Sequence, residues 1–574
     1  MRYTCVAFDY DGTLASDGRV PEDVLHALSK VKQTGRVLVL VTGRRLNELL
    51  KIFSHVTIFD LVICENGAVL YDPVTKAVKL LAEPPGLEFI NNLKVRGIDN
   101  LEIGQVVVAT WHPHETIAIE VIQEMGLDLH ITFNKGAVMI LPPEINKGSG
   151  LRAALGELNI SSHNTLSIGD AENDLAMFAA SECSAAVANA LPNVKSHASI
   201  TTRADHGQGV IELLNRLLET DLSECEQVVR QHQIGLGTTD DGKVLEFNAY
   251  NCSILIAGPS KSGKSTIAMS LLENMAACGY QYCVIDPEGE YHRAPRAVLI
   301  GNQHYAPDVS DIIHALDNPA DNVVVNLLSV DLNERPAFLG RLVCALQDMR
   351  RTRGRPHWIV VDEAHHMLHP YWDETLEPEW SDLGSIVLIT VDPAEISKRV
   401  LSEIDLILAV GRDTSKTFKS FADHIGQRAP EEAKDIPGWG TAVAWFRHEH
   451  MLPVRMSIGV TPVEHQRHMR KYAAGDVGSQ RSFYFTGPEN RFKIRCQNLF
   501  LFLQISDGLD DSTWNFHLRR GDFSNWFRDI IRDPSLANET WQLERNNSLS
   551  AFETRQRIRK LIEQRYSPPT KLLG

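Results

Sequence analysis

Short apolar runs alternate with longer helix-like segments along most of the chain. Runs of four to six residues, typical of buried strands, stand at 4–8, 37–41, 165–168, 253–257, 357–361 and 385–390. Helix-like stretches follow several of them, for example 266–277. Strands that alternate with helices predict parallel sheets covered by helices, so we expect an α/β fold.

The alternation is interrupted twice, which predicts three domains, at 1–220, 225–462 and 465–574. The polar, glycine-bearing stretch 232–243 follows the first and predicts an entry hairpin to the second. The third opens with the helix-like stretch 465–474 and closes with a polar helix at 552–565. Its strand candidates are 482–485 and 499–503, so we expect a small α+β domain there.

The composition is that of an ordinary globular protein, with 43% hydrophobic and 23% charged residues among 574. No uninterrupted apolar run reaches the roughly 18 residues of a membrane span, and the first residues do not resemble a signal peptide. Nine cysteines lie without CxxC pairs, which favours reduced thiols. We therefore expect a cytoplasmic protein without a membrane partner.

The net charge of −16 argues against a protein whose whole surface binds nucleic acid. Residues 465–574, however, carry 18 Lys+Arg and 12 Asp+Glu. Within them, 514–527 interleaves aromatic residues with arginines, a pattern that stacks bases or that forms a strand, a turn and a helix with aromatic residues in a core. Core packing is the favoured interpretation, and nucleic acid stays a candidate partner.

Two carboxylates, Asp9 and Asp11, follow the first strand two positions apart. One carboxylate of such a pair can attack phosphorus while the other protonates the leaving oxygen. Gly12 permits the backbone turn that brings amides near a phosphate. Three further pieces follow in order: the hydroxyl turn Thr42-Gly43, the cation Lys147, and the carboxylates Asp170 and Asp174, which suit Mg²⁺.

This ordered set resembles the haloacid dehalogenase (HAD) superfamily, in its Cof-type and sugar-phosphatase branch. The resemblance implies a Rossmann-like domain with a short C2-type cap at about 75–140. It implies Mg²⁺-dependent hydrolysis of a phosphorylated small molecule through an aspartyl-phosphate, with Asp9 as nucleophile and Asp11 as general acid/base. The implied phosphate ligands are Thr42, Gly43 and the catalytic Lys147, and the implied metal ligands are Asp9, Asp11, Asp170 and Asp174. The alternative is an inactive relic.

Residues 258–265 match the P-loop pattern GxxxxGK[ST] between a predicted strand and a predicted helix. Backbone amides of such a loop wrap phosphates, and the helix N-terminus adds positive potential. Lys264 would reach the β- and γ-phosphates, and Ser265 would bind Mg²⁺. The expected ATP-binding residues are Gly258, Pro259, Ser260, Lys261, Ser262, Gly263, Lys264, Ser265 and Thr266.

Downstream, the apolar strand 357–361 ends in Asp362 and Glu363. Asp362 suits the magnesium shell, and Glu363 suits polarisation of an attacking water, which favours a hydrolase over a kinase. His365 and His369 stand at i and i+4, which would place them on one helix face. Without an HExxH pattern, packing or solvated histidines are favoured over a metal site.

Together with the segment 286–289, Asp-Pro-Glu-Gly, these motifs resemble the HerA/FtsK-type translocase ATPases over about 230 residues. The resemblance implies a P-loop NTPase α/β domain that takes ATP as substrate and assembles as a homo-oligomer, with a hexameric ring as one form. The sequence departs from the family after Thr390, where Val391 replaces a polar residue, often Gln, that senses the γ-phosphate.

The two constellations predict a bifunctional hydrolase, a phosphatase joined to an ATPase. Two alternatives remain. One is a nucleic-acid end-processing kinase/phosphatase, which would transfer the γ-phosphate to a polynucleotide end. The other is a regulatory phosphatase that ATP binding switches without turnover.

Overall fold

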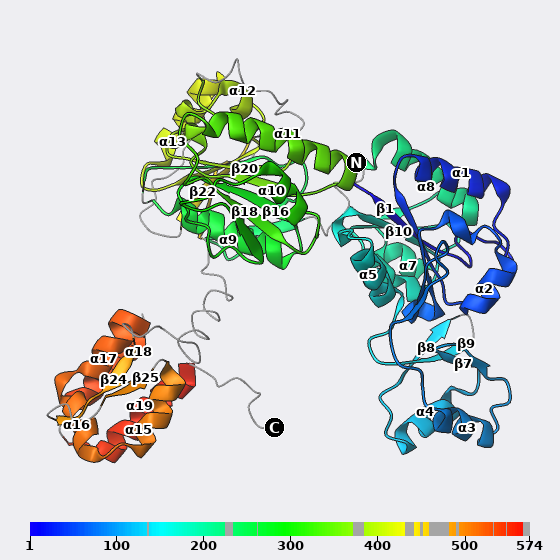
Figure 1. Cartoon of the computed structure of the whole chain (residues 1–574), viewed down its shortest axis with the longest axis horizontal. Coiled ribbons are helices and arrows are strands. Elements are labelled where there is room, and N and C mark those ends of the chain that lie inside the picture. The colour runs from blue at the N-terminus through cyan, green and yellow to red at the C-terminus, as the bar shows by residue number, and fades with distance from the viewer. Residues whose placement is uncertain are drawn as a thin grey trace. The chain divides into compact units, whose positions relative to one another are not determined.

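The computed structural model describes residues 1–134, 137–223, 233–260, 262–370, 384–430, 441–447, 452–457, 482–488, 493–496, 498–531, 533–546 and 548–565. The chain forms two compact units, Met1–Ile458 and Gly459–Gly574. The first unit contains three sheets, and the second contains one short hairpin and helices (Figure 1).

The first sheet places strand β1 among parallel neighbours. Its strand order is β12-β11-β10-β1-β2-β3-β4-β5. The bounds are β1 Cys5–Asp9, β2 Val37–Val41, β3 Leu61–Cys64, β4 Val69–Tyr71, β5 Val78–Leu80, β10 Thr165–Gly169, β11 Cys183–Ala186 and β12 Ile200–Thr201. All five residues of β1 are buried, as its apolar sequence predicts.

Helices cover both faces of this sheet (Figure 1). Alternate residues of a strand point to opposite sides, so the buried side chains of β1 pack against helices on each face. Val6 and Phe8 pack into a core with α1 Glu22–Gln33 and α8 His206–Thr220. Cys5 and Ala7 pack into the opposite core. That core includes α5 Lys147–Glu157, α6 Leu175–Phe178 and α7 Pro192–His197, while α2 Leu46–Ile52 contributes to the first.

A small antiparallel sheet is inserted between β5 and α5. Its order is β6-β7-β9-β8, with bounds β6 Glu102–Ile103, β7 Val108–Trp111, β8 His130–Asn134 and β9 Ala137–Leu141. Helices α3 Leu87–Val95 and α4 Glu115–Glu124 pack on it through a separate apolar core. We call residues 87–141 the cap.

The second large sheet has strand order β14-β13-β23-β22-β21-β15-β20-β19-β16-β18-β17. The bounds are β13 Gln233–Thr239, β14 Val244–Asn248, β15 Ile254–Ala257, β16 Tyr282–Asp286, β17 Ala297–Ile300, β18 Asn322–Asn326, β19 Trp358–Val361, β20 Ile386–Thr390, β21 Leu406–Val410, β22 Thr441–Phe446 and β23 Val454–Ser457. Strands β13 and β14 pair antiparallel, which confirms the expected entry hairpin. The strands from β21 to β17 run parallel.

Helices also pack against both faces of this sheet (Figure 1). Leu255 and Ala257 of β15 face a core that contains α11 Arg335–Arg353, α10 Val309–Ala315, α12 Lys398–Leu401 and α13 Thr414–Ile425. Ile254 and Ile256 face the core that contains α9 Lys264–Ala277. The parallel, doubly covered arrangement follows the predicted alternation of strands and helices.

The described part of the second unit is mostly helical. It contains the hairpin β24 Phe483–Phe485 with β25 Ile494–Cys496 and helices α15 Leu499–Gly508, α16 Asp511–Arg520, α17 Asp522–Trp526, α18 Pro534–Glu544 and α19 Ala551–Arg565. The strand expected at 482–485 and the helix expected at 552–565 are confirmed. The strand expected at 499–503 is wrong, because the Asn498 side chain accepts the Leu501 N–H at 2.8 Å and starts helix α15. Residues 465–474 lie outside the described residues.

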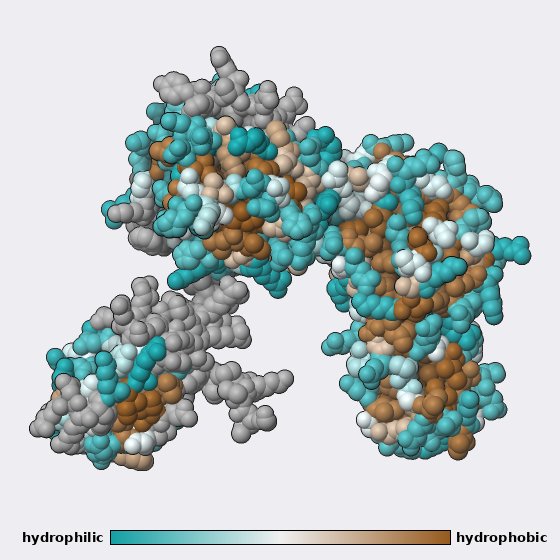
Figure 2. Space-filling view, in the orientation of Figure 1, coloured by the Kyte–Doolittle hydropathy of each residue, from teal (hydrophilic) through white to brown (hydrophobic). Residues whose placement is uncertain are grey.

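The aromatic and arginine segment 514–527 contributes to the core of this unit. Trp514, Phe523, Trp526 and Phe527 are buried together. The segment forms helices α16 and α17, so the strand expected at its start is wrong, whereas the packing interpretation is confirmed. On the face shown in Figure 2, hydrophilic residues cover much of the described surface. Among the described helices, none is both long and apolar enough to cross a bilayer.

Candidate active site

Parallel strands bring the first group of predicted residues to one edge of the first sheet. Asp9 ends β1, Thr42 follows β2, and Asp170 follows β10, with β1 between the other two strands. Because the three strands run parallel, their carboxyl ends meet at the same edge. Helix α5 begins there with Lys147, after Asn146 caps its first turn.

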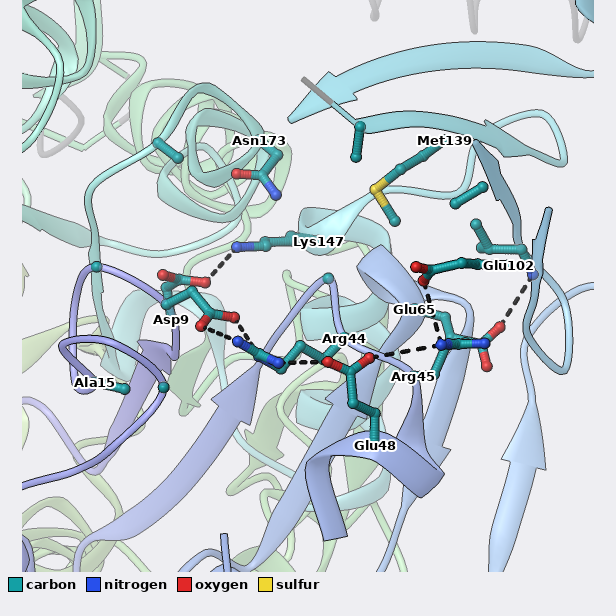
Figure 3. Close-up of a pocket in the computed structure, with 18 of the residues that line it drawn as sticks. Asp9, Ala15, Arg44, Arg45, Glu48, Glu65, Glu102, Met139, Lys147 and Asn173 are labelled. Atoms are coloured by element: carbon teal, nitrogen blue, oxygen red, sulfur yellow. Dashed lines mark hydrogen bonds and ion pairs between the residues drawn. The ribbon is translucent and has the colours of Figure 1, made fainter. Parts of the chain in front are cut away.

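Lys147 joins two of the carboxylates. Its Nζ donates to Asp9 Oδ1 at 2.5 Å (Figure 3). It also donates to Asp174 Oδ1 at 2.6 Å, and only 2% of the residue is exposed. Burial acts to lower the pKa of Lys147, but Asp174 and Asp9 outweigh it and raise the net pKa. The ammonium group therefore stays charged.

Three buried carboxylates surround this lysine. Oxygen atoms of Asp9, Asp170 and Asp174 all lie within 4.8 Å of one another. Burial, the Asp174 charge and the Asp170 charge raise the pKa of Asp9, and Lys147 only partly opposes them. Three carboxylates against one ammonium leave a buried negative charge. This donor set of oxygen atoms fits a divalent cation such as Mg²⁺.

Gly12 allows the loop after β1 to approach this cluster. Its φ is +91°, and a Cβ atom there would stand 2.3 Å from Asp170 Oδ2. Any larger residue would displace the Asp170 carboxylate. The glycine of the first motif is thus needed both for its backbone conformation and for space.

Asp11, two residues beyond Asp9, is held by an arginine. Arg44 donates through Nε to Asp11 Oδ2 at 2.6 Å and through Nη2 to Asp11 Oδ1 at 2.7 Å (Figure 3). Arg44 Nη1 also donates to Glu48 at 2.5 Å. The structure therefore places the Asp11 carboxylate on Arg44, and the three-carboxylate cluster comprises Asp9, Asp170 and Asp174.

A cavity of about 590 Å³ separates this edge from the cap. Its lining includes Asp9, Asp11, Gly43 and Lys147 on the sheet side and Glu102, Trp111 and Met139 on the cap side (Figure 3). Thr42 is 1% exposed, and its hydroxyl accepts the Arg44 N–H at 3.1 Å.

Glu65 ties the cap to the sheet. This residue, in the short 3-10 helix Glu65–Gly67 after β3, is 1% exposed. Its carboxylate accepts the backbone N–H groups of Gln105, Val106 and Val107 at 2.8, 2.9 and 3.0 Å. A second link joins Arg45 to Glu102 at 3.3 Å (Figure 3). The sequence analysis gave no role to Glu65 or Arg44. Only their positions, soon after the ends of strands, could have indicated that they lie near the site.

The second predicted group lies between β15 and α9. Gly258 has a φ of +159°, and a Cβ there would stand 2.1 Å from the Val410 carbonyl oxygen. Lys264 is the first residue of α9, is 6% exposed, and donates to the carbonyl oxygens of Gly258 at 3.0 Å and Pro259 at 3.2 Å. Lys261 lies outside the described residues. The remaining members of the predicted set, Pro259 to Thr266, occupy this loop and the first turn of α9.

Carboxylates stand at the same edge of the second sheet. Asp362 follows β19, is 3% exposed, and accepts the Glu363 N–H at 2.9 Å. Burial raises the pKa of Asp362 to about 7. In the next strand, Asp286 ends β16 and accepts four successive N–H groups, from residues 288 to 291. The Asp-Pro-Glu-Gly segment is therefore a turn organised by Asp286.

The histidines after Glu363 do not share a helix face. The 3-10 helix Ala364–His366 ends before His369, so the expectation that His365 and His369 lie on one helix face is wrong. His365 is partly buried, with Nδ1 3.3 Å from Thr390 Oγ1. Glu363, His365 and His366 offer ligand atoms within 4.8 Å of one another, although His366 is exposed.

The sequence matches the family described as haloacid dehalogenase-like hydrolase over residues 6–83 and 96–214. It is 28% identical over 221 residues to a phosphoglycolate phosphatase of Methanothermobacter thermautotrophicus, a match that covers 37% of this chain and 98% of that protein. It is 30% identical over 229 residues to phosphoglycolate phosphatase 2 of Saccharolobus solfataricus, covering 37% of this chain and 91% of that protein. The solved haloacid dehalogenase-like hydrolase of Bacteroides thetaiotaomicron is 17% identical, with a TM-score of 0.34, covering 38% of this chain and all of that one.

Proposed function

Because the chain belongs to the haloacid dehalogenase-like hydrolases through residues 6–214, we propose that its first site hydrolyses phosphomonoesters. The observation that carries this proposal is the buried contact of Lys147 with Asp9 and Asp174, beside Asp170. A carboxylate nucleophile, a fixed cation and a candidate divalent-cation site therefore stand within one cluster.

In this proposal Asp9 is the nucleophile and Asp11 moves the proton. A bond forms between an Asp9 oxygen and phosphorus as the ester P–O bond breaks, and Asp11 gives its proton to the departing oxygen. A water oxygen then bonds to phosphorus, the bond from phosphorus to Asp9 breaks, and Asp11 takes a proton from that water. Alcohol and phosphate leave, Asp9 is again a free carboxylate, and Asp11 is again protonated.

The surrounding residues hold these groups in place. Arg44 orients the Asp11 carboxylate through two hydrogen bonds. Gly43 lines the cavity, and in this proposal the Thr42 hydroxyl and the Gly43 amide would bind phosphate oxygens. Asp9, Asp170 and Asp174 would hold Mg²⁺, which when bound offsets the negative charge of the phosphoryl oxygens. The cap above the cavity excludes bulk water and selects the rest of the substrate.

The test is phosphate release with Mg²⁺ from p-nitrophenyl phosphate, phosphoglycolate and a set of sugar monophosphates. Phosphoglycolate is included because the relatives are named for it. Asp9→Asn should lower turnover at least about 1,000-fold, since the nucleophile is removed. The exposed cap residue Asp99 provides the control Asp99→Asn, which should leave turnover unchanged. Turnover by Asp9→Asn near the wild-type rate would refute the proposal.

A second proposal concerns the loop between β15 and α9, which we infer binds and hydrolyses ATP. The support is the strand–loop–helix geometry with buried Lys264 at the helix start and buried Asp362 at the end of β19. Asp362 and Ser265 would hold Mg²⁺. The oxygen of a water molecule would bond to the γ-phosphorus, and Glu363 would accept a proton from that water. The bond between the γ-phosphorus and the oxygen that bridges it to the β-phosphorus breaks, and ADP leaves.

ATP turnover by wild type, Lys264→Ala and the exposed control Lys419→Ala tests this second proposal. Lys264→Ala should abolish turnover, whereas Lys419→Ala should not change it. ATP binding without turnover would identify a nucleotide switch instead. Transfer of the γ-phosphate to a polynucleotide 5′ end would identify a kinase. The same assay with added DNA tests whether nucleic acid is a partner. The particle size in solution tests whether the chain forms a homo-oligomer.

A further inference from the structure

An apolar residue follows strand β20 at the position where the ATPases that the sequence resembles often have a polar one. Strand β20 lies between β15, which leads into the P-loop, and β19, which leads to Asp362. Thr390 is its last residue and is fully buried, and the apolar Val391 follows. The residue directly after β20 therefore offers no polar side chain.

His365, in the short helix after β19, contacts the last residue of β20. Its Nδ1 atom lies 3.3 Å from Thr390 Oγ1 and 3.4 Å from Glu363 Oε2. The Thr390 hydroxyl donates its single proton to the Asp392 carbonyl oxygen at 3.2 Å. The hydroxyl can then accept from His365, in the tautomer whose Nδ1 carries the proton, and that proton also faces the Glu363 carboxylate.

The backbone at Glu363 is strained. Its φ and ψ are +43° and +48°, in the left-handed region that a residue with a Cβ rarely occupies. Such conformations persist where the surrounding structure enforces them, and they are frequent at active sites. In this turn the Glu363 carboxylate lies beside His365.

The charge state of His365 suits a hydrogen-bond donor near Lys264. Burial and the neighbouring His366 lower the pKa of His365 to about 4, and the Lys264 charge adds to the effect. The imidazole is therefore neutral at pH 7. It can donate from Nδ1 without placing a second cation next to Lys264.

We propose that His365 is a positioning residue for ATP hydrolysis, which orients the Glu363 carboxylate and couples it to Thr390. The proposal rests on the nucleotide function inferred above. In this arrangement His365 supplies, from the element after β19, the polar contact that Val391 does not supply after β20. It holds the carboxylate that takes the proton from the attacking water, so its loss acts on the chemical step and not on nucleotide affinity.

The experiment measures kcat and KM for Mg-ATP, and the Kd of a fluorescent ATP analogue, for the full-length chain. His365→Ala should lower kcat about 10- to 100-fold, the usual effect of losing a group that orients a catalytic residue. KM and Kd should stay within about 2-fold. His365→Asn, whose amide N–H can replace the Nδ1 proton, should recover a large part of kcat. His314→Ala, at a histidine whose side chain is 90% exposed, should match wild type.

Coupling to Glu363 has its own readout. The double variant His365→Ala/Glu363→Gln should be no slower than Glu363→Gln alone, because the two residues act as one unit. The Kd of the ATP analogue and the urea unfolding curve of each variant report that the nucleotide domain is folded. A wild-type kcat in His365→Ala, or a loss explained by weaker binding, would overturn the proposal while leaving ATP hydrolysis intact. If wild type shows no Lys264-dependent ATP turnover, the nucleotide function and this proposal fall together.

Discussion

The two sites of this chain share one plan and differ in what their lysines contact. Each lies at the carboxyl edge of a parallel sheet, and each lysine is the first residue of a helix, Lys147 of α5 and Lys264 of α9. Lys147 donates to two carboxylates at 2.5 and 2.6 Å. Lys264 donates to two backbone carbonyls at 3.0 and 3.2 Å.

This difference follows from where the reacting negative charge originates. In the first site the proposed nucleophile, Asp9, belongs to the protein, so the lysine has its charged partners before any substrate arrives. In the second site the partner would be a nucleotide phosphate, and the lysine contacts neutral carbonyls in its absence. In the functions proposed here, Lys147 therefore keeps its charged partners within the fold, whereas Lys264 would exchange neutral carbonyls for a nucleotide phosphate.

The largest expected effect that separates the sites is on stability. Lys147→Met should destabilise the chain by about 3–5 kcal/mol, because Asp9 and Asp174 would remain buried without their cation. Lys264→Met should cost about 1–2 kcal/mol, since only hydrogen bonds to carbonyls are lost. Urea unfolding without Mg²⁺ or nucleotide measures both. Equal destabilisation by the two changes would contradict the comparison.

The next effect tests the arginine that holds Asp11. Arg44→Met should lower the kcat for phosphomonoesters about 10- to 100-fold, because the Asp11 carboxylate loses both hydrogen bonds that orient it. ATP turnover should not change. The control is Arg19→Met, at an exposed arginine of the loop after β1. A phosphatase kcat unaffected by Arg44→Met would remove Arg44 from the site.

A smaller effect concerns the cap. Glu65→Gln keeps the shape of the side chain but replaces one acceptor oxygen by an NH₂ group, so the three N–H groups of the cap cannot all be accepted. We expect KM for the phosphomonoester to rise about 3- to 10-fold, with a smaller change in kcat, because the cap is held less firmly over the cavity. The control Glu83→Gln lies at an exposed position and should match wild type. An unchanged KM in Glu65→Gln would show that Glu65 does not control closure.

The smallest effect is a pH dependence of stability. Burial lowers the pKa of His357 well below its usual value, and its Nδ1 accepts the Gln281 N–H at 2.8 Å, so the folded ring is neutral. The unfolded chain binds a proton at this histidine below about pH 6.5 and the folded chain does not, so stability falls as the pH drops. From pH 6.5 to 5.5 the contribution is at most about 1.4 kcal/mol.

Urea unfolding of wild type and His357→Gln at several pH values between 5.5 and 7.5 measures this contribution. The variant should lose part of the pH dependence below pH 6.5, even though it is less stable at every pH. Parallel stability curves for the two proteins would show that His357 is not the titrating group.

The sequence predicts the features that depend on strand ends. Asp9, Asp170, Lys264 and Asp362 each stand directly after an apolar strand or at a helix start, and parallel topology alone brings such positions to one edge. The contacts of Arg44 and Glu65 depend instead on folding of the cap and of the turns after β2 and β3. No local pattern encodes which backbone groups Glu65 meets 40 residues later in the chain.

The misassigned segment 499–503 has a different cause. A run of five apolar residues is as compatible with a buried helix as with a strand, and periodicity cannot separate the two. The distinguishing signal was Asn498, whose side chain caps helix α15. The segment 514–527 was ambiguous because aromatic residues interleaved with arginines suit both base stacking and core packing, and its first helix ends at Gly521 in the left-handed conformation.

The most direct test of the two-site account is a crossed assay. Phosphomonoester and ATP turnover are measured with Mg²⁺ for wild type, Asp9→Asn, Lys264→Ala and the double variant. The account predicts that Asp9→Asn loses only phosphomonoester turnover, Lys264→Ala loses only ATP turnover, and the double variant loses both. Loss of both activities in either single variant, or ATP turnover that depends on Asp9 and not on Lys264, would contradict it.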